Sequence, residues 1–188
     1  MEHLGIQNTG SGAVSSTFGS VWLLRHARSQ ANLEGIIASK PETALLHHGL
    51  CVEGRRQAME VPLPFSPDAD IMILSSDYLR ASQTALLLQT RLPLSRCLLD
   101  SRLRERDFGP LDGLSHELYA DAWKHDAMQE VMDGVESPPQ VLERALAAIV
   151  DASGKAKGFA PSLPSVLVVV AHGDVLQILL AHAEGLGP

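Results

Sequence analysis

Cysteine is scarce in this chain of 188 residues, which contains only Cys51 and Cys97. Two isolated cysteines are too few for a disulfide framework or for a zinc site built on paired C-x-x-C motifs. We therefore expect both side chains to be ordinary thiols of the core or of the surface.

Long apolar runs are also missing, and no stretch approaches the roughly 20 apolar residues that a membrane-spanning helix needs. The first 20 residues begin with an acidic side chain, Glu2, and contain no apolar core typical of a signal peptide. We therefore predict a flexible polar tail over residues 1–20, a cytoplasmic location and no membrane partner.

Basic residues are in the minority, with 15 Lys and Arg against 22 Asp and Glu, which gives a net charge of -7. Sequence-independent binding of nucleic acid depends on clustered Lys and Arg side chains. The composition therefore predicts no nucleic-acid partner. Any anion that this chain binds must be held by a local pocket rather than by the whole surface.

What the chain does contain is a set of short apolar runs, each followed at once by polar, helix-like sequence. The runs are VWLL at residues 21–24, IMIL at 71–74 and VLVVV at 166–170. Continuous apolar strands that alternate with helices are typical of a parallel sheet covered on both faces. We predict an α/β fold: a three-layer sandwich with a mostly parallel central sheet and helices on both faces. A single domain over residues 21–188 is expected, because a chain of this length buries one core without metals or disulfides.

The intervening sequence predicts further elements. Residues 53–60 favour a helix, 96–99 a strand, and 114–132 a less regular helical region. Ser137 has the features of a helix N-cap, with proline in the first helical position and Gln140 as its capping-box partner, and opens a helix that we expect to end near Asp151. The Gly-, Pro- and Ser-rich residues 153–165 are predicted to form a surface connection.

Four cationic or imidazole side chains follow these apolar runs: Arg25, His26, Arg80 and His172. In open α/β sheets, residues just beyond the carboxyl ends of the strands meet in one crevice. Two guanidinium groups and two imidazoles suit a phosphate dianion, because an Arg fork matches its oxygens and keeps its charge. An adjacent Arg also favours the neutral imidazole, whose free lone pair can attack phosphorus.

A proton donor for a leaving alkoxide is available in the segment LRERDFGPLDG, which contains Glu105 and Asp107. The flanking Arg104 and Arg106 would lower the pKa of Glu105, whereas a bound phosphate dianion would raise it. The sequence leaves this balance open.

The segment RHARSQAN at residues 25–32 resembles the R-H-G-x-S-x-x-N signature of the histidine phosphatase superfamily, which includes the phosphoglycerate mutases. The segments EGRRQA, SSDYLRASQTA, LRERDFGPLDG and VVVAHGDVLQ resemble the same superfamily in the same order. The resemblance implies a phosphoglycerate mutase-like fold, His26 as the phosphorylated residue and Glu105 as the proton donor. It further implies phosphoryl or substrate contacts from Arg25, Ser29, Asn32, Arg80, His172 and Gly173.

Two positions depart from the signature: Ala27 replaces the usual glycine, and Arg28 stands where an acidic or amide residue is common. We expect the β-carbon of Ala27 to restrict the loop and Arg28 to add positive charge near the pocket. The remaining histidines are expected to be surface or packing residues: His47, His48, His116, His125 and His182. Metal binding by some of them is the alternative, but adjacent guanidinium groups repel cations, and we expect no metal or cofactor.

Hydrolysis of a small phosphorylated metabolite is the function that the resemblance favours. Phosphoglycerate mutases usually carry a sizeable insertion after the Glu motif and a Trp-containing stretch after the first motif. Here the interval 113–137 is short, and IIASK at residues 36–40 replaces that stretch. Phosphoryl transfer by a mutase and phospho-ligand binding by a regulatory module remain as alternatives. Many relatives continue beyond the position of Pro188 into a segment over the site, so an open, weakly selective pocket is expected.

Overall fold

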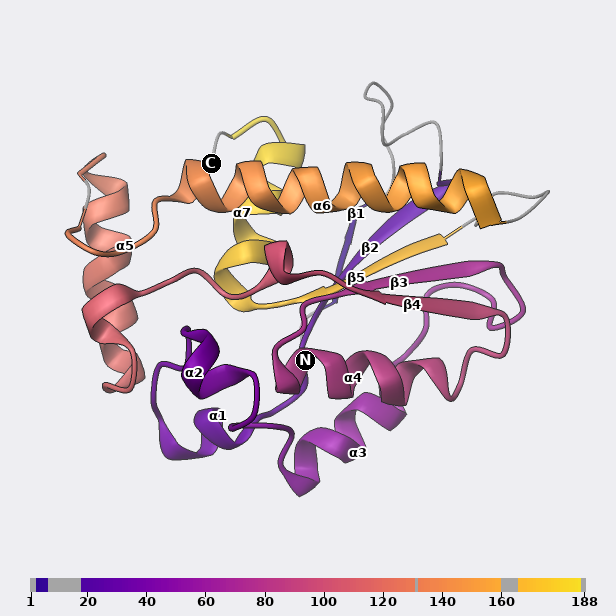
Figure 1. Ribbon diagram of the computed structural model, residues 1–188, viewed down its shortest axis with the longest axis horizontal. Coiled ribbons are helices and arrows are strands. Elements are labelled where there is room, and N and C mark those ends of the chain that lie inside the picture. Colours follow the sequence, from indigo (N-terminus) through magenta and orange to yellow (C-terminus); the bar gives the residue numbers. More distant parts are fainter. Residues whose placement is uncertain (1–2, 7–17, 131, 160–165, 187–188) are drawn as a thin grey trace.

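The computed structural model describes residues 3–6, 18–130, 132–159 and 166–186. Its centre is a sheet in the strand order β1-β2-β5-β3-β4, in which every pair is parallel except the antiparallel pair of β1 with β2 (Figure 1). The predicted α/β architecture is confirmed. The strands are β1 (His3–Ile6), β2 (Ser20–Arg25), β3 (Ile71–Ser75), β4 (Ser95–Leu99) and β5 (Val166–Ala171).

Helices cover both faces of the sheet. In Figure 1, α6 and α7 lie on one side of the strands and α3 and α4 on the other, while α1, α2 and α5 gather at one end. The α-helices are α1 (Gln30–Glu34), α2 (Pro41–Ala44), α3 (Val52–Glu60), α4 (Leu79–Gln89), α5 (Tyr119–Ala127), α6 (Pro138–Phe159) and α7 (Gly173–Ala183). Three short 3-10 helices are η1 (Ser101–Leu103), η2 (Gly109–Leu111) and η3 (His116–Leu118). Within the described residues, no helix has the length and apolar character needed to cross a membrane.

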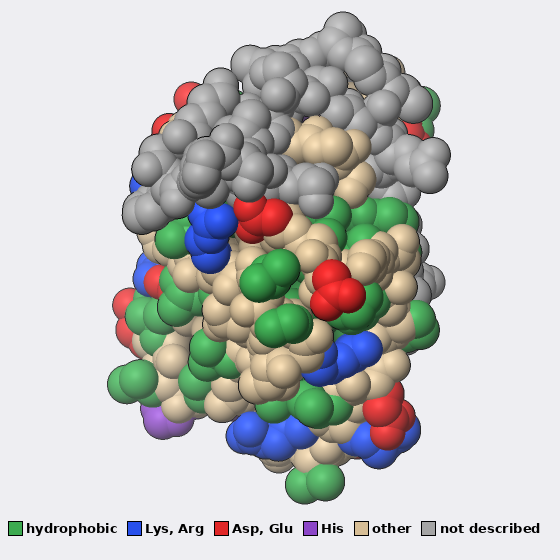
Figure 2. Space-filling view, turned by 90° about the vertical axis from the view of Figure 1, so that its right-hand side faces the viewer, with side chains coloured by type: hydrophobic (Ala, Val, Ile, Leu, Met, Phe, Trp, Pro, Cys, Tyr) green, Lys and Arg blue, Asp and Glu red, His purple; other side chains and the backbone are tan. Residues whose placement is uncertain are grey.

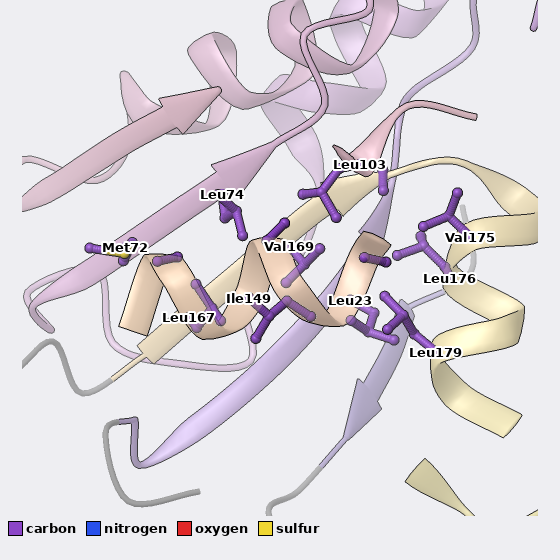
Figure 3. Close-up of a cluster of buried hydrophobic side chains, with 14 of the residues drawn as sticks. Leu23, Met72, Leu74, Leu103, Ile149, Leu167, Val169, Val175, Leu176 and Leu179 are labelled. Atoms are coloured by element: carbon purple, nitrogen blue, oxygen red, sulfur yellow. The ribbon is translucent and has the colours of Figure 1, made fainter. Parts of the chain in front are cut away.

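The central strands are continuously apolar because both of their faces are buried. Alternate side chains of β3 and β5 enter opposite cores, so that Met72 and Leu167 pack with α6 and α7 whereas Ile73 and Val168 pack with α4. Figure 3 shows the first of these cores, in which Leu23, Leu74, Val169 and neighbouring side chains fill the space between the sheet and the two helices.

Helix α6 is longer than the sequence suggested. As expected, it begins after Ser137, whose backbone N–H donates to Oε1 of Gln140 at 2.9 Å. The predicted surface connection at 153–165 is wrong for residues 153–159, which continue the helix to Phe159. Its buried face runs through Ala148, Ala152 and Ala156, and this spacing of four outweighs the nearby Gly and Ser residues. Residues 160–165 lie outside the described part of the chain.

The expected polar tail contains a strand. Residues 3–6 form β1, whose Leu4 pairs opposite Leu23 of β2, because the edge of β2 offers unpaired backbone groups. The sheet therefore gains an antiparallel edge strand that the tail prediction did not contain. Residues 1–2 and 7–17 lie outside the described part.

The molecular face at the right-hand side of Figure 1 is shown in Figure 2. On this face the basic side chains lie apart from one another and among acidic ones, rather than in a patch. The charged groups that matter for chemistry lie instead at the carboxyl ends of the strands.

Candidate active site

The polar residues that follow β2 and β5 lie side by side at the carboxyl edge of the sheet. Arg25 ends β2 and His26 follows it, while His172 directly follows β5. The parallel pairing extends past the strand ends, since the backbone N–H of His26 donates to the carbonyl of Ala171 at 2.9 Å. Ser76, which follows β3, donates to β5 in the same way at 3.0 Å. The fold thus places both histidines next to each other.

The side chain of Arg80, from the first turn of α4, fixes the tautomer of His26. Its Nε donates to Nε2 of His26 at 3.0 Å, and its Nη2 donates to the carbonyl of Ala38 at 3.0 Å. The other ring nitrogen, Nδ1, lies 2.8 Å from the carbonyl of Ala27. Because a guanidinium only donates and a carbonyl only accepts, the ring proton is on Nδ1 and the lone pair on Nε2.

His172 lies directly behind His26, with 5.2 Å between the ring centroids. Its Nε2 is 2.9 Å from the hydroxyl of Ser76, and the ring of Tyr78 packs edge-on against it at 5.5 Å. Tyr78 is itself fixed, because its hydroxyl donates to the carbonyl of Ser39 at 2.5 Å. These contacts leave His172 little freedom to rotate.

Both imidazoles are neutral near physiological pH. Burial lowers the pKa of His26 well below its usual value, and the positive charge of Arg80 lowers it further. Burial followed by the charge of Arg80 also lowers the pKa of His172. A neutral His26 keeps the Nε2 lone pair that a nucleophile needs.

Two buried nitrogen atoms beside His26 have no hydrogen-bond partner among the described residues. They are Nη1 of Arg80 and Nδ1 of His172. A buried polar group without a partner costs about 1–3 kcal/mol, so such atoms are normally satisfied. The Nη1 atom of Arg80 can only donate a hydrogen bond, so an oxyanion is a suitable partner for it.

Glu105 supplies a carboxyl group to the same pocket. It lies between η1 and η2, is almost fully buried, and its Oε1 accepts a hydrogen bond from the backbone N–H of Arg106 at 3.0 Å. Burial, and then the negative charge of Asp174, raise the pKa of Glu105 to about 7. Arg80 only partly offsets these effects. The balance left open by the sequence thus favours a carboxyl group that both donates and accepts a proton near neutral pH.

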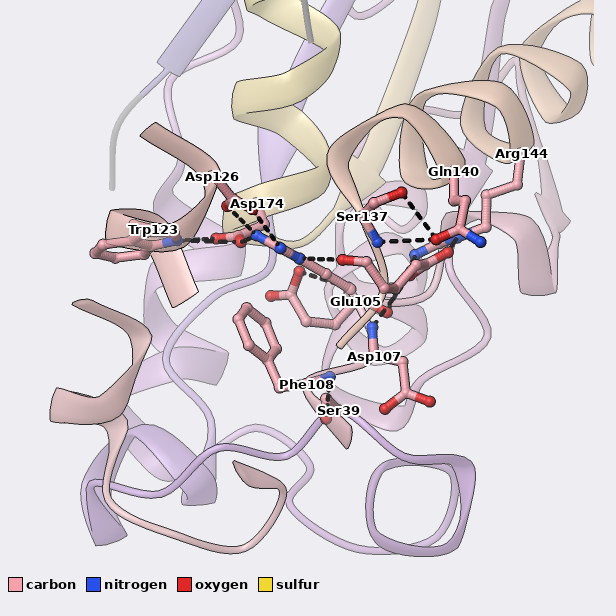
Figure 4. A network of polar contacts seen from close by, with 12 residues as sticks. Ser39, Glu105, Asp107, Phe108, Trp123, Asp126, Ser137, Gln140, Arg144 and Asp174 are labelled. Atoms are coloured by element: carbon pink, nitrogen blue, oxygen red, sulfur yellow. Dashed lines mark hydrogen bonds and ion pairs between the residues drawn. The ribbon is translucent and has the colours of Figure 1, made fainter. Parts of the chain in front are cut away.

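Arg106 takes part in an ionic network with Asp126 and Asp174, whose side chains Figure 4 shows near Trp123. Its guanidinium bonds Asp126 at 2.5 and 2.8 Å and Asp174 at 3.4 Å. The indole N–H of Trp123 donates to Asp174 at 3.1 Å. The network joins α5 to α7 and holds Asp174, whose negative charge contributes to the raised pKa of Glu105. Sequence analysis did not identify Asp174.

Replacing Arg106 with alanine should therefore lower the free energy of unfolding by about 3 kcal/mol, because the buried carboxylate of Asp174 and the partly buried one of Asp126 lose their shared cation. Urea unfolding monitored by circular dichroism measures the change. Arg56→Ala is the matched control, since Arg56 forms its ion pairs with Glu53 and Glu60 on the exposed surface of α3. Equal, small effects of the two substitutions would contradict the structural role of this network.

The pocket around His26 has a volume of about 190 Å³. It opens between the first loop after β2 and the segment that leads into α5. The lining side chains are Arg25, His26, Ser29, Ala31, Asn32, Ile36, Ala38, Arg80, Glu105, His116 and Tyr119.

The remaining predicted site residues occupy different places. Ser29 and Asn32 both line the pocket and form the capping box of α1, in which the Ser29 hydroxyl lies 2.9 Å from Oδ1 of Asn32. Gly173 begins α7 beside the guanidinium of Arg25 and does not belong to the lining. Asp107, the alternative carboxylate, is exposed and accepts from the backbone N–H of Gly109 at 2.7 Å.

Both departures from the signature can be located in the structure. The methyl group of Ala27 packs in a small apolar cluster with Leu50 and Ala58, and its backbone N–H donates to the hydroxyl of Thr84 at 3.1 Å. The extra β-carbon thus helps to anchor the loop. Arg28 is exposed and does not line the pocket.

His116 and Tyr119 are pocket residues that sequence reasoning missed, since His116 was expected to be an ordinary surface or packing side chain. They reach the pocket because the segment before η3 pairs with the segment after α1 through a bridge between Ile36 and Ser115. Nothing in the local sequence signals this long-range pairing. Among the described residues, no group of three or more His, Cys, Asp or Glu side chains is placed to hold a metal ion.

Comparisons with known proteins relate the chain to one superfamily. The family model of the histidine phosphatase superfamily, branch 1, matches residues 21–188. A glucosyl-3-phosphoglycerate phosphatase of Mycobacterium tuberculosis is 32% identical over 168 residues, which cover 85% of this chain and 72% of that protein. A 2,3-bisphosphoglycerate-dependent phosphoglycerate mutase of Rhizobium etli is 29% identical over 173 residues, with 87% and 79% covered.

A solved structure supports the same grouping. The mycobacterial glucosyl-3-phosphoglycerate phosphatase, in its complex with VO3, matches with a TM-score of 0.61 and 30% sequence identity. The match covers 85% of this chain and 78% of that chain.

Proposed function

Because this chain belongs to the histidine phosphatase superfamily, we propose that it hydrolyses small phosphomonoesters through a phosphohistidine at His26. The observation that carries this proposal is the arrangement around Nε2 of His26. The lone pair of a neutral imidazole there accepts a hydrogen bond from Arg80, and the buried Nη1 donor of Arg80, which has no partner among the described residues, lies beside it. Turnover of p-nitrophenyl phosphate and a panel of metabolites, including 3-phosphoglycerate, tests the proposal directly.

In the first step, the N–H of Arg80 that bonds Nε2 of His26 shifts to a phosphoryl oxygen, and Nε2 attacks phosphorus in line with the departing ester oxygen. The new N–P bond forms as the P–O bond breaks, while Arg25 and Arg80 hold the phosphoryl oxygens and neutralise their charge. The Nη1 atom of Arg80, which has no partner among the described residues, then gains an acceptor. The protonated carboxyl group of Glu105 donates its proton to the leaving oxygen.

In the second step, the carboxylate of Glu105 takes a proton from water, whose oxygen attacks phosphorus. The N–P bond breaks and its electron pair returns to Nε2, which frees inorganic phosphate. Glu105 regains the proton that it lost in the first step. The raised pKa of Glu105 suits this double role, because a group with a pKa near the working pH both donates and accepts readily.

We expect kcat/KM for alkyl phosphates to show a bell-shaped dependence on pH. The substrate's own second ionisation near pH 6 gives the rising limb. Above about pH 7, loss of the Glu105 proton should lower kcat/KM about tenfold per pH unit. The pH profile of kcat/KM for glycerol 3-phosphate measures this fall above about pH 7. If the Glu105→Gln variant showed the same fall, the fall could not be assigned to the Glu105 proton.

The scheme uses only side chains, so treatment with EDTA should leave phosphate release within about twofold of the untreated rate. The reason is that Arg25 and Arg80 supply the positive charge that a metal would otherwise supply, and they repel a cation. Activity that is lost in EDTA and restored by added metal would contradict a metal-independent mechanism.

Phosphoryl transfer between two hydroxyl groups is the second candidate, which the Rhizobium etli mutase relative favours. It differs from hydrolysis only in the fate of phosphohistidine. Measuring isomerisation of 3-phosphoglycerate together with phosphate release separates the two activities. Absence of both would point to a phospho-ligand-binding role.

We also propose a cytoplasmic location, which the small phosphorylated substrates support.

A further inference from the structure

Ile36, His116 and Tyr119 form one part of the pocket lining, called the wall below, and Arg25 and Arg80 belong to the rest of the lining. Ile36 is half-buried and forms a bridge with Ser115, and the backbone N–H of His116 donates to the carbonyl of Gly35 at 2.9 Å. The imidazole of His116 packs directly over Gly35. Two loops far apart in the sequence therefore build one wall, against which the alcohol part of a phosphomonoester would lie.

The ring of Tyr119 is held firmly in this wall. It stacks on Trp123 with 5.7 Å between centroids and meets the edge of Phe108 at 4.6 Å. Trp123 is in turn anchored by its hydrogen bond to Asp174. A rigid aromatic surface binds a flat or apolar group with little loss of side-chain entropy.

The pocket contains positive charge for one phosphoryl group and no more. Among the described residues that line it, the only Lys or Arg side chains are Arg25 and Arg80. Both are needed by the phosphoryl oxygens, which carry two negative charges. A second anionic group on the substrate would lie next to the carboxyl group of Glu105 without a guanidinium or ammonium partner.

Among the described residues, the neighbouring groove offers no unpaired Lys or Arg side chain either. This groove has a volume of about 520 Å³, shares Glu105 with the pocket, and contains Arg104 and Arg144. Arg104 is paired with Asp77 at 2.8 and 2.6 Å, and Arg144 with Glu136 at 2.6 and 2.8 Å. Because both guanidinium groups are matched by bidentate carboxylates, a substrate carboxylate placed there would displace an existing ion pair.

We propose that the leaving group is an uncharged alcohol or phenol that lays an apolar or aromatic face against Tyr119 and Ile36. Substrates of this enzyme then carry a single phosphoryl group and no second anion. This inference rests on the proposed phosphatase function and specifies its substrate class. The small volume of the pocket, about 190 Å³, further limits the buried part of the leaving group to a few atoms.

Two matched pairs of substrates test the charge requirement. Phenyl phosphate is compared with 4-carboxyphenyl phosphate, and glycerol 3-phosphate with 3-phosphoglycerate, by phosphate release. In each pair we expect kcat/KM of the uncharged member to be at least about tenfold higher, because the carboxylate loses water without gaining a cation. The carboxyl substituent makes the phenolate a slightly better leaving group, so reactivity alone predicts the opposite order for the first pair.

Substitutions in the wall test its role. Tyr119→Ala should lower kcat/KM for phenyl phosphate about tenfold, and Tyr119→Phe should preserve it, because the ring provides the contact. Ile36→Arg should raise kcat/KM for 3-phosphoglycerate at least about tenfold by adding the missing cation. Leu33→Arg is the matched control, since Leu33 is exposed on α1 and does not line the pocket.

The outcomes separate the two claims. Phosphate release with equal or better kcat/KM for the charged member of each pair would overturn the inference and leave the phosphatase function standing. The inference would also be overturned, and the phosphatase function would stand, if Ile36→Arg and Leu33→Arg changed kcat/KM for 3-phosphoglycerate by the same factor. No phosphate release from any of the four esters would overturn the proposed function, and the inference with it.

Discussion

Replacing His26 with alanine should stop the release of phosphate from every phosphomonoester, with a fall in kcat of at least about 10⁴-fold. The Nε2 atom of His26 carries the lone pair of a neutral ring and accepts a hydrogen bond from Arg80, which binds the phosphoryl oxygens in the proposed reaction. The neighbouring His172 cannot replace it, because its ring is packed behind His26 and held by Ser76. Steady-state phosphate release measures the loss.

His182→Ala is the control for this experiment, since His182 is an exposed histidine near the end of α7. It should retain wild-type activity. The thermal unfolding of both variants should show that each is folded. A folded His26→Ala protein with more than about a tenth of the wild-type kcat would contradict a covalent role for this residue.

The second large effect concerns Glu105→Gln, whose consequence should depend on the leaving group. For an alkyl phosphate we expect kcat/KM to fall about 10²–10⁴-fold, because an alkoxide must be protonated as it departs. For p-nitrophenyl phosphate the fall should be less than about tenfold, since p-nitrophenolate leaves without a proton. Similar losses for both esters would indicate that Glu105 positions the substrate rather than donating a proton. Asp107→Asn, which changes the exposed carboxylate two residues away, should leave both rates unchanged.

The same variant should be more stable than the wild type at alkaline pH. The folded-state pKa of Glu105 is raised from 4.5 to about 7, so the folded protein binds a proton that the unfolded chain has already lost in this interval. Native stability therefore decreases as the pH rises from about 4.5 through 7. Glu105→Gln removes this penalty, and its melting temperature near pH 8 should exceed that of the wild type. Greater stability with lower activity rules out unfolding as the cause of the lost turnover.

Much of the fold could be predicted because its signals are local. The runs at 21–24, 71–74 and 166–170 are continuously apolar, and each became a strand, of which β3 and β5 are buried on both faces. Arg25, His26 and His172 could be placed together because they follow those runs in a parallel sheet. The N-terminus of α6 followed from Ser137 and Gln140.

The parts that escaped prediction depend on contacts between distant segments. The strand β1 exists only because the edge of β2 is available, and the end of α6 reflects three alanines that bury one face. His116 and Tyr119 enter the pocket through the bridge between Ile36 and Ser115. The effect of Asp174 on Glu105 crosses from α7 to the loop before η2. None of these pairings has a signature in the local sequence.

The most direct test of the account is to trap the phosphorylated enzyme. The wild-type protein is mixed with a 32P-labelled monoester, quenched in alkali within milliseconds and digested for mass spectrometry. We predict an alkali-stable, acid-labile phosphoryl group on Nε2 of His26, formed and lost at rates compatible with turnover, and its absence from His26→Ala. Rapid turnover without any label on His26, or a label on another side chain, would contradict the central claim.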